Sequence, residues 1–425
     1  MKPTTAGSNK QRLARILGPG LITGAADDDP SGVATYSQVG AQFGYGLAWT
    51  LLLSYPLMVA IQQVSARIGR VTGRGIAGNL HRHYPGWLAL GLIGLLSIAN
   101  VINLGADLGA MGAALRLLLR GPALLYVVLF GLLSVLLMVF SDYRRYVAIL
   151  RWLCLALLSY VVCAFVVPVA WSEVALALVW PPLSRHADYI MAIVAVFGTT
   201  ISPYLFFWQA QQEVEGSQQD AAARPLLHTP HDAPAEFARI RIDTTIGMAV
   251  SNLIALCIVV TTAATLHAHG ITNIESAAQA AEALRAVAGR LTFAVFALGI
   301  IGTGLLTLPV LAASAAYSVG ELLSWRVGLG HKPQRARAFY TAIAAATVLG
   351  GALNCIHVNP IRALYWSAVL NGVVAVPVMM AMMHLAVRRE VMGTLTVPCR
   401  LRWVGWVSTC VMTLTVLAMA VSWFV

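Results

Sequence analysis

The sequence is dominated by apolar stretches that are long enough to cross a lipid bilayer. Residues 123–140, 147–170 and 291–310 form three of them, and about 20 apolar residues in a helix span the ~30 Å of hydrocarbon in a membrane. Apolar residues make up 59% of the chain and charged residues only 11%, a balance that excludes an ordinary soluble domain. The sequence therefore predicts an all-α integral membrane protein.

Eleven such segments follow one another along the chain. They are expected, within a few residues at each end, at 17–40, 46–66, 87–115, 123–141, 147–170, 188–212, 240–268, 291–322, 338–356, 361–386 and 403–424. The longest polar stretch, 211–239, contains prolines and charges of both signs and is interpreted as a loop between segments. We therefore expect a single membrane transport domain over residues 1–425.

Basic residues are unevenly distributed over the loops between these segments. All but six of the 28 Lys and Arg residues fall on the side that holds the amino terminus, and cytoplasmic loops of membrane proteins carry such an excess. Residues 1–16 are therefore predicted to be a cytoplasmic tail of a protein in the bacterial inner membrane, and the odd number of segments places the carboxyl terminus outside. Contact with the lipid bilayer accounts for the net charge of +11, so neither nucleic acid nor an obligatory protein partner is indicated.

Three acidic residues interrupt the first apolar segment, where residues 27–32 read DDDPSG. Each carboxylate at membrane depth costs roughly 3 kcal/mol to insert. Pro30 lacks an N–H and disfavours helix at Asp29, and Gly32 permits unusual backbone angles, so the helix should break here and leave carbonyl oxygens unpaired. Such backbone persists inside a membrane only where it lines a cavity or binds a ligand.

The sixth apolar segment is interrupted in the same way, because residues 198–203 read GTTISP. The two breaks lie five segments apart, so 17–170 and 188–386 are predicted to be corresponding five-helix repeats, followed by an extra helix at 403–424. Broken helices at corresponding positions are typical of inverted-repeat secondary transporters, whose substrate site lies where the breaks face each other. An ordinary proline kink explains one break alone, but explains two matched breaks less well.

Oxygen atoms predominate at both breaks, as a hard or borderline divalent cation requires. The predicted metal ligands come from Asp28, Asp29, Ser31, Gly32, Thr199, Ser202 and, in the tenth segment, Asn371. Three further residues are predicted to support the site or couple it to a second ion: Asp107, Tyr204 and Gln209. For Asp107, which shares one side of the third segment with Asn100 and Asn103, a hydrogen bond between packed helices is the open alternative.

The residues around the breaks resemble those of a known family. GPG at 18–20, DPSG at 29–32 and FGY at 43–45 resemble the first helix of the Nramp (natural resistance-associated macrophage protein) metal transporters, and GTTISPY at 198–204 lies where that family has a methionine-proline-histidine motif. The resemblance implies a leucine-transporter-like 5+5 inverted repeat with broken helices 1 and 6. It also implies alternating-access uptake of divalent metal, commonly manganese or iron, often with protons.

The chain departs from the family's motifs at three positions. Gly32 replaces a ligand asparagine, and Ser202 replaces a methionine whose soft sulfur favours transition metals over magnesium or calcium. Tyr204 replaces a histidine associated with proton transport, and tyrosine, with an unperturbed pKa of about 10, does not readily exchange protons near neutral pH. Asp27 and Asp28 add carboxylates beside Asp29, Asp28 being favoured to approach the ion. The expected substrates are thus manganese, iron or magnesium, with proton coupling undecided.

Other classes of function fit the residues less well. A sodium-coupled transporter of a small organic solute on the same fold would leave half-helix amino ends free for a carboxylate, which three acids would repel. A non-transporting metal sensor would need a soluble domain to pass on its signal. No H-E-x-x-H, G-x-S-x-G or P-loop motif is present, so neither an enzyme activity nor a resident cofactor is expected.

Overall fold

The computed structural model describes residues 19–140, 148–150, 152–180, 182–184, 186–219, 224–274, 277–356 and 359–422. These described residues form helices and no strands, which confirms the predicted all-α class. The predicted cytoplasmic tail, 1–16, lies outside them.

Each of the eleven predicted segments coincides with helix. The helices concerned are α2 (Pro19–Asp27) with α3 (Pro30–Phe43), α4 (Ala48–Thr72), α6 (Gly86–Leu119), α7 (Ala123–Phe140), α9 (Leu158–Val166), α11 (Ala187–Thr200) with α12 (Pro203–Gln219), α13 (Ala233–Thr265), α14 (Ala277–Leu322), α15 (Arg337–Leu353), α16 (Pro360–Val387) and α18 (Cys399–Ser422). Within the described ranges, eight helices or continuous pairs are long and apolar enough to cross a membrane. A ninth span results if α9 and α10 (Trp171–Val179), bent by 119°, are counted as one.

The interpretation of 211–239 as a loop was wrong over most of its length. Helix α12 continues to Gln219, and α13 begins at Ala233. The polar side chains of this stretch do not end the helix because they are buried between helices: Gln211, Gln212 and Glu213 are all less than 5% exposed. Polarity alone therefore did not distinguish a loop from the buried end of a helix.

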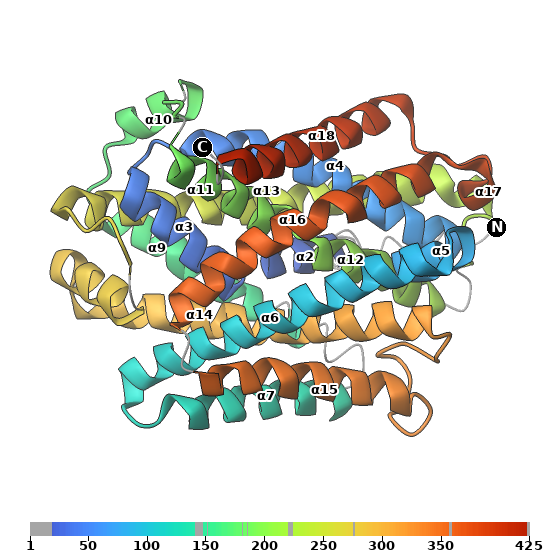
Figure 1. The fold of residues 1–425 in the computed structure, drawn as a ribbon, viewed down its shortest axis with the longest axis horizontal. Coiled ribbons are helices and arrows are strands. Elements are labelled where there is room, and N and C mark those ends of the chain that lie inside the picture. Colours follow the sequence, from blue (N-terminus) through green and yellow to red (C-terminus); the bar gives the residue numbers. More distant parts are fainter. Residues whose placement is uncertain are drawn as a thin grey trace, which may run out of the picture.

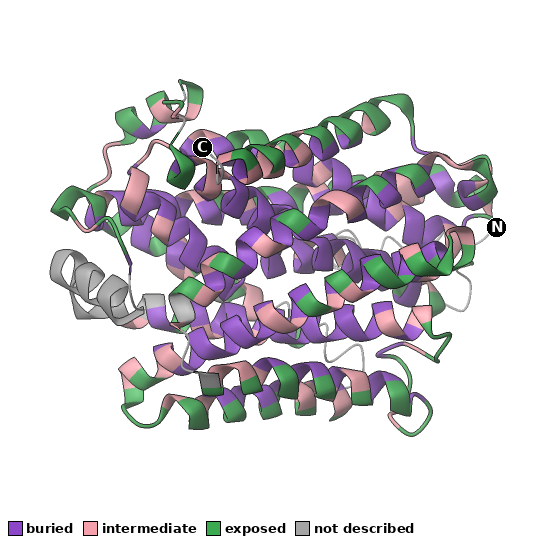
Figure 2. Cartoon of the chain, viewed as in Figure 1, coloured by how far each residue is buried: buried purple, intermediate pink, exposed green. Residues whose placement is uncertain are grey.

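Exposed residues lie along the edges of the bundle (Figure 2), and many of them are large and apolar. On α7 the leucines at 125, 129, 132 and 136 are between 40% and 55% exposed. A continuous face of exposed leucine is unfavourable in water but favourable against the hydrocarbon chains of a lipid bilayer. The chain is thus a multi-pass integral membrane protein.

The broken helix formed by α2 and α3 lies in the interior, whereas α7 and α15 pack together along one edge and α18 lies along the opposite edge (Figure 1). Helix α13 runs beside both halves of the broken helix. Its backbone touches that of α2, since an added methyl group at Gly24 would lie only 2.2 Å from the Gly247 carbonyl oxygen. This close packing fixes the position of the first break relative to α13.

Candidate metal site

The first predicted break is present between α2 and α3. Helix α2 ends at Asp27, and Asp29 is the N-cap of α3, with extended backbone (φ −67°, ψ 168°). Its side chain accepts a 2.5 Å hydrogen bond from the N–H of Gly32. The predicted break at DPSG is thus confirmed, and the structure adds its details: Asp29 caps the new helix, and Pro30 occupies the first helical position, where an N–H is not needed.

The second predicted break is present between α11 and α12. Ile201 and Ser202 separate the two helices, and Pro203 begins α12. The Ser202 hydroxyl lies 2.8 Å from the carbonyl oxygens of both Gly198 and Thr199. It thus donates within its own break, satisfying the end of α11.

The carboxylate of Asp29 is buried and accepts hydrogen bonds from three helices. Besides the Gly32 N–H on Oδ1, its Oδ2 accepts from Asn103 Nδ2 of α6 at 2.9 Å and from the Tyr204 hydroxyl of α12 at 3.2 Å. Tyr204 also lies 2.9 Å from the carbonyl oxygen of Ala26, near the end of α2. The two breaks therefore face each other across a hydrogen bond, as the inverted-repeat interpretation predicts.

Three oxygen atoms converge beside Asp29, at Gly32. A methyl group added to Gly32 would lie 3.1 Å from the carbonyl oxygen of Asp27, 3.1 Å from Thr199 Oγ1 and 3.4 Å from Asp29 Oδ1. One carboxylate oxygen, one carbonyl oxygen at the end of α2 and one hydroxyl oxygen thus face the side of Gly32 where another residue would carry a side chain. We call these three oxygens the Gly32 cradle. Its oxygens are the ligand type that hard divalent cations prefer.

The two acids before Asp29 have different surroundings. Asp27 Oδ2 lies 2.6 Å from the hydroxyl of Ser251 on α13, which donates to it. Both carboxylate oxygens of Asp28 are buried and have no hydrogen-bond partner among the described residues. Asp28 is therefore the acid of this pair whose oxygens are not already engaged.

The other predicted site residues are not all brought to Asp29. Ser31 contacts α16 through the Leu364 carbonyl at 2.9 Å, and Gln209 donates to Thr244 at 2.9 Å. Asp107, one turn beyond Asn103 on α6, is buried and lies close enough to Asp29 for the two carboxylates to interact electrostatically. The amide oxygen of Asn371 is buried without a hydrogen-bond partner among the described residues. Within those residues, no three His, Cys, Asp or Glu side chains converge as a metal-binding group. The candidate site is thus the Asp29 carboxylate with carbonyl and hydroxyl oxygens, and Asp107 lies nearby.

Two serines that contact this site were missed by the sequence interpretation. Ser251 on α13 bonds Asp27, and Ser367 on α16 lies 2.8 Å from Asn103 Oδ1. Each is a single small hydroxyl within an apolar helix, distant in sequence from both breaks. No signal in the sequence distinguishes them from serines that bond their own helix.

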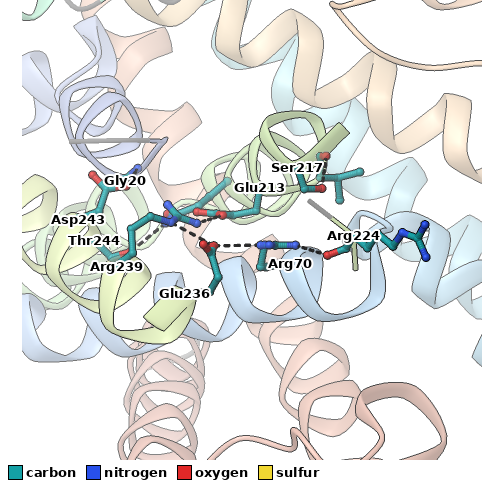
Figure 3. A network of polar contacts seen from close by, with 11 residues as sticks. Gly20, Arg70, Glu213, Ser217, Arg224, Glu236, Arg239, Asp243 and Thr244 are labelled. Carbon is teal, nitrogen blue, oxygen red and sulfur yellow. Dashed lines mark hydrogen bonds and ion pairs between the residues drawn. The ribbon is translucent and has the colours of Figure 1, made fainter. Parts of the chain in front are cut away.

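A second polar cluster secures the amino end of α2 (Figure 3). Asp243 of α13 accepts the N–H groups of Gly20 at 2.7 Å and Leu21 at 3.2 Å. One turn earlier on α13, Arg239 forms an ion pair with Glu213 of α12. Glu236 links Arg239 to Arg70 of α4, at 3.3 and 3.0 Å. The first turn of α2, whose N–H groups have no partner within the helix, is thus capped by a carboxylate from another helix.

The fold has known counterparts among transporters of low sequence identity. It is similar to a crystal structure of the Eremococcus coleocola manganese transporter, with a TM-score of 0.75 and 17% identity over 98% of this chain and 88% of that one. It is also similar to Mhp1, a nucleobase-cation-symport-1 family transporter, with a TM-score of 0.60 and 15% identity over 96% and 92% of the two chains. Two broken helices that meet at a buried polar site, in this arrangement, define a membrane protein of the leucine-transporter-like fold.

Sequence comparison narrows this class to one family. The family model described as natural resistance-associated macrophage protein-like matches residues 20–422. The chain belongs to the Nramp family. It is 28% identical over 392 residues to the divalent metal cation transporter MntH of Verminephrobacter eiseniae, covering 90% of this chain and 83% of that protein.

Proposed function

We propose that this protein transports divalent metal cations, namely manganese, iron or magnesium, through a site at Asp29 and the Gly32 cradle. The observation that carries the proposal is the convergence of Asp29 Oδ1, the Asp27 carbonyl oxygen and Thr199 Oγ1 beside Gly32, which has no side chain. The carbonyl end of α2 adds the negative pole of a helix dipole. Similarity to a protein named as a divalent metal cation transporter and to a manganese transporter supports the same cargo.

The donor set of the cradle consists of oxygen, without sulfur. Hard cations such as magnesium and manganese prefer carboxylate, carbonyl and water ligands, whereas thioethers favour softer metals. We therefore expect magnesium and manganese to be carried at least as well as iron.

Alternating access is the proposed mode of transport. Asp29 is only 2% exposed, so the site must open to each side in turn for an ion to enter and leave. Because α2 is separated from α3 by the break, it can tilt without carrying α3 with it. Release of its first turn from Asp243 is the proposed opening step on the side of the amino terminus. The distribution of basic residues supports a cytoplasmic amino terminus in a cytoplasmic membrane.

Purified protein reconstituted into liposomes tests the function directly. Wild-type protein is expected to carry manganese or magnesium, and Asp29→Ala is expected to reduce the flux to that of empty vesicles. The matched control is Asp232→Ala, which removes an exposed aspartate and should leave the flux unchanged. An imposed proton gradient, added to the same assay, tests proton coupling. Wild-type flux no greater than that of empty vesicles for manganese, iron and magnesium would contradict the proposal.

A further inference from the structure

The two carboxylate oxygens of Asp29 have unequal surroundings. A carboxylate oxygen has two lone pairs, and Oδ2 accepts hydrogen bonds from two side chains, Asn103 and Tyr204. Oδ1 accepts a hydrogen bond from the Gly32 N–H of its own helix. It is also the oxygen that borders the Gly32 cradle. Oδ1 therefore faces the cradle, whereas Oδ2 faces the side-chain donors of α6 and α12.

This asymmetry depends on the orientation of the Asn103 amide. An amide group has one accepting and one donating end. The ionised carboxylate of Asp29 only accepts, so Nδ2 faces it, and Ser367, with its hydroxyl 2.8 Å from Asn103 Oδ1, donates to the other end of the amide. With the amide reversed, its oxygen would face Oδ2 of Asp29, and two acceptors would repel each other.

The Ser367 hydroxyl is itself held within a small network. It lies 3.0 Å from the hydroxyl of Ser31 and 2.7 Å from the Leu364 carbonyl oxygen, and Ser31 reaches the same carbonyl at 2.9 Å. Ser31 donates to the Leu364 carbonyl oxygen, and the single proton of Ser367 lies between that carbonyl and Asn103 Oδ1. The three groups are less than 2% exposed, so water does not compete for these bonds.

We propose that Asn103 and Ser367 are positioning residues, which orient the Asp29 carboxylate so that Oδ1 faces the transported cation. This inference rests on the proposed function of the Gly32 cradle. It assigns a task to α6 and α16, which contribute no oxygen to the cradle. The carboxylate is correctly oriented only while α3, α6 and α16 remain packed against one another.

Binding of Mn²⁺ to purified protein, measured by isothermal titration calorimetry, tests the inference. Asn103→Ala is expected to raise the dissociation constant at least about tenfold, as loss of a hydrogen bond to a charged group predicts, and Ser367→Ala, which removes a hydrogen bond between neutral groups, about two- to tenfold. Ser367→Thr, which keeps the hydroxyl, should restore binding to within about twofold of wild type. The matched control is Asn100→Ala, which removes a buried amide from the same helix whose atoms have no hydrogen-bond partner among the described residues. It should leave the dissociation constant unchanged.

The outcomes separate the inference from the proposed function. If wild-type protein binds Mn²⁺ and Ser367→Ala binds it equally well, the inference is overturned and the proposed function stands. If Ser367→Thr binds Mn²⁺ as weakly as Ser367→Ala, the loss of affinity comes from altered packing and the inference is overturned. The same holds if Asn100→Ala binds Mn²⁺ as weakly as Asn103→Ala. A wild-type protein that binds neither Mn²⁺ nor Mg²⁺ overturns the proposed function and the inference together.

Discussion

The hydroxyl of Tyr204 lies 3.2 Å from Asp29 Oδ2, so the first turn of α12 contacts the carboxylate that caps α3. Both side chains are buried, and the same hydroxyl reaches the carbonyl oxygen of Ala26 at 2.9 Å. The Tyr204 hydroxyl, at the second break, thus contacts both α2 and the residue that caps α3, on the two sides of the first break. Any movement of α12 away from α2 and α3 must break these contacts.

Tyr204→Phe is therefore expected to weaken Mn²⁺ binding. The phenyl ring keeps the packing, while loss of a hydrogen bond to a charged group costs about 1 kcal/mol or more, which corresponds to roughly a fivefold higher dissociation constant. Titration calorimetry on purified protein measures the change. Tyr340→Phe serves as the control, because its hydroxyl bonds the backbone of His331, far from either break. Equal binding by Tyr204→Phe and wild type would show that the contact does not shape the site.

Gly32→Ala is expected to abolish cation binding without unfolding the protein. Its added methyl group would occupy the cradle, 3.1 Å from two of the three oxygens, and would exclude the ion sterically. We expect the Mn²⁺ dissociation constant to rise by at least about tenfold, equivalent to about 1.4 kcal/mol. Gly91→Ala on α6 is the matched control, since an added methyl group there meets no atom within 4 Å. Mn²⁺ binding by Gly32→Ala as tight as that of wild type would remove the cradle from the proposed site.

Asp243→Ala should loosen the first turn of α2. The Gly20 and Leu21 N–H groups lose a charged acceptor, and such bonds contribute roughly 1.5 to 3 kcal/mol. Hydrogen–deuterium exchange of peptides covering residues 19–27 should accelerate about tenfold or more. Asp232→Ala, which truncates an exposed aspartate, should leave that exchange unchanged. Unaltered exchange in Asp243→Ala would argue against the proposed release of α2 as the opening step.

Arg239→Met should lower the thermal stability of the protein in detergent. Glu213 is buried beside Arg239, and removing one partner of a buried ion pair leaves an uncompensated charge, at a cost of about 3–5 kcal/mol. Arg241→Met removes an exposed arginine two residues later on α13 and should leave the melting temperature nearly unchanged. Adding Glu213→Gln to Arg239→Met should restore part of the lost stability. A double variant no more stable than Arg239→Met would show that the charge of Glu213 is not the cause.

The helices and their breaks were predictable because they depend on local chemistry. Pro30 and Pro203 begin α3 and α12 as expected, since a missing N–H is tolerated only in the first turn of a helix. The extent of α12 was not predictable in the same way. Glu213 looks like a loop residue until Arg239, on another helix, is seen to neutralise it.

The contacts around the candidate site were predictable only in part. Asp29 and Thr199, each predicted from a break, are brought together, but Ser202 donates to carbonyl groups of its own break, and Gln209 bonds α13 instead. Ser367 orients Asn103 from a helix much later in the chain. Such pairings depend on side-chain direction after packing, which periodicity along one helix does not reveal.

By itself the sequence determined that this chain lies in a membrane and that two of its helices are interrupted there. Apolar length and the backbone chemistry of proline and glycine act over a few residues, so no tertiary information is needed for either conclusion. Only the tertiary structure decided which oxygens meet. The Asp27 carbonyl and the Thr199 hydroxyl lie together beside Gly32 because α3 packs against α11. The Asp29 carboxylate turns Oδ2 toward the donors of α6 and α12 and Oδ1 toward Gly32.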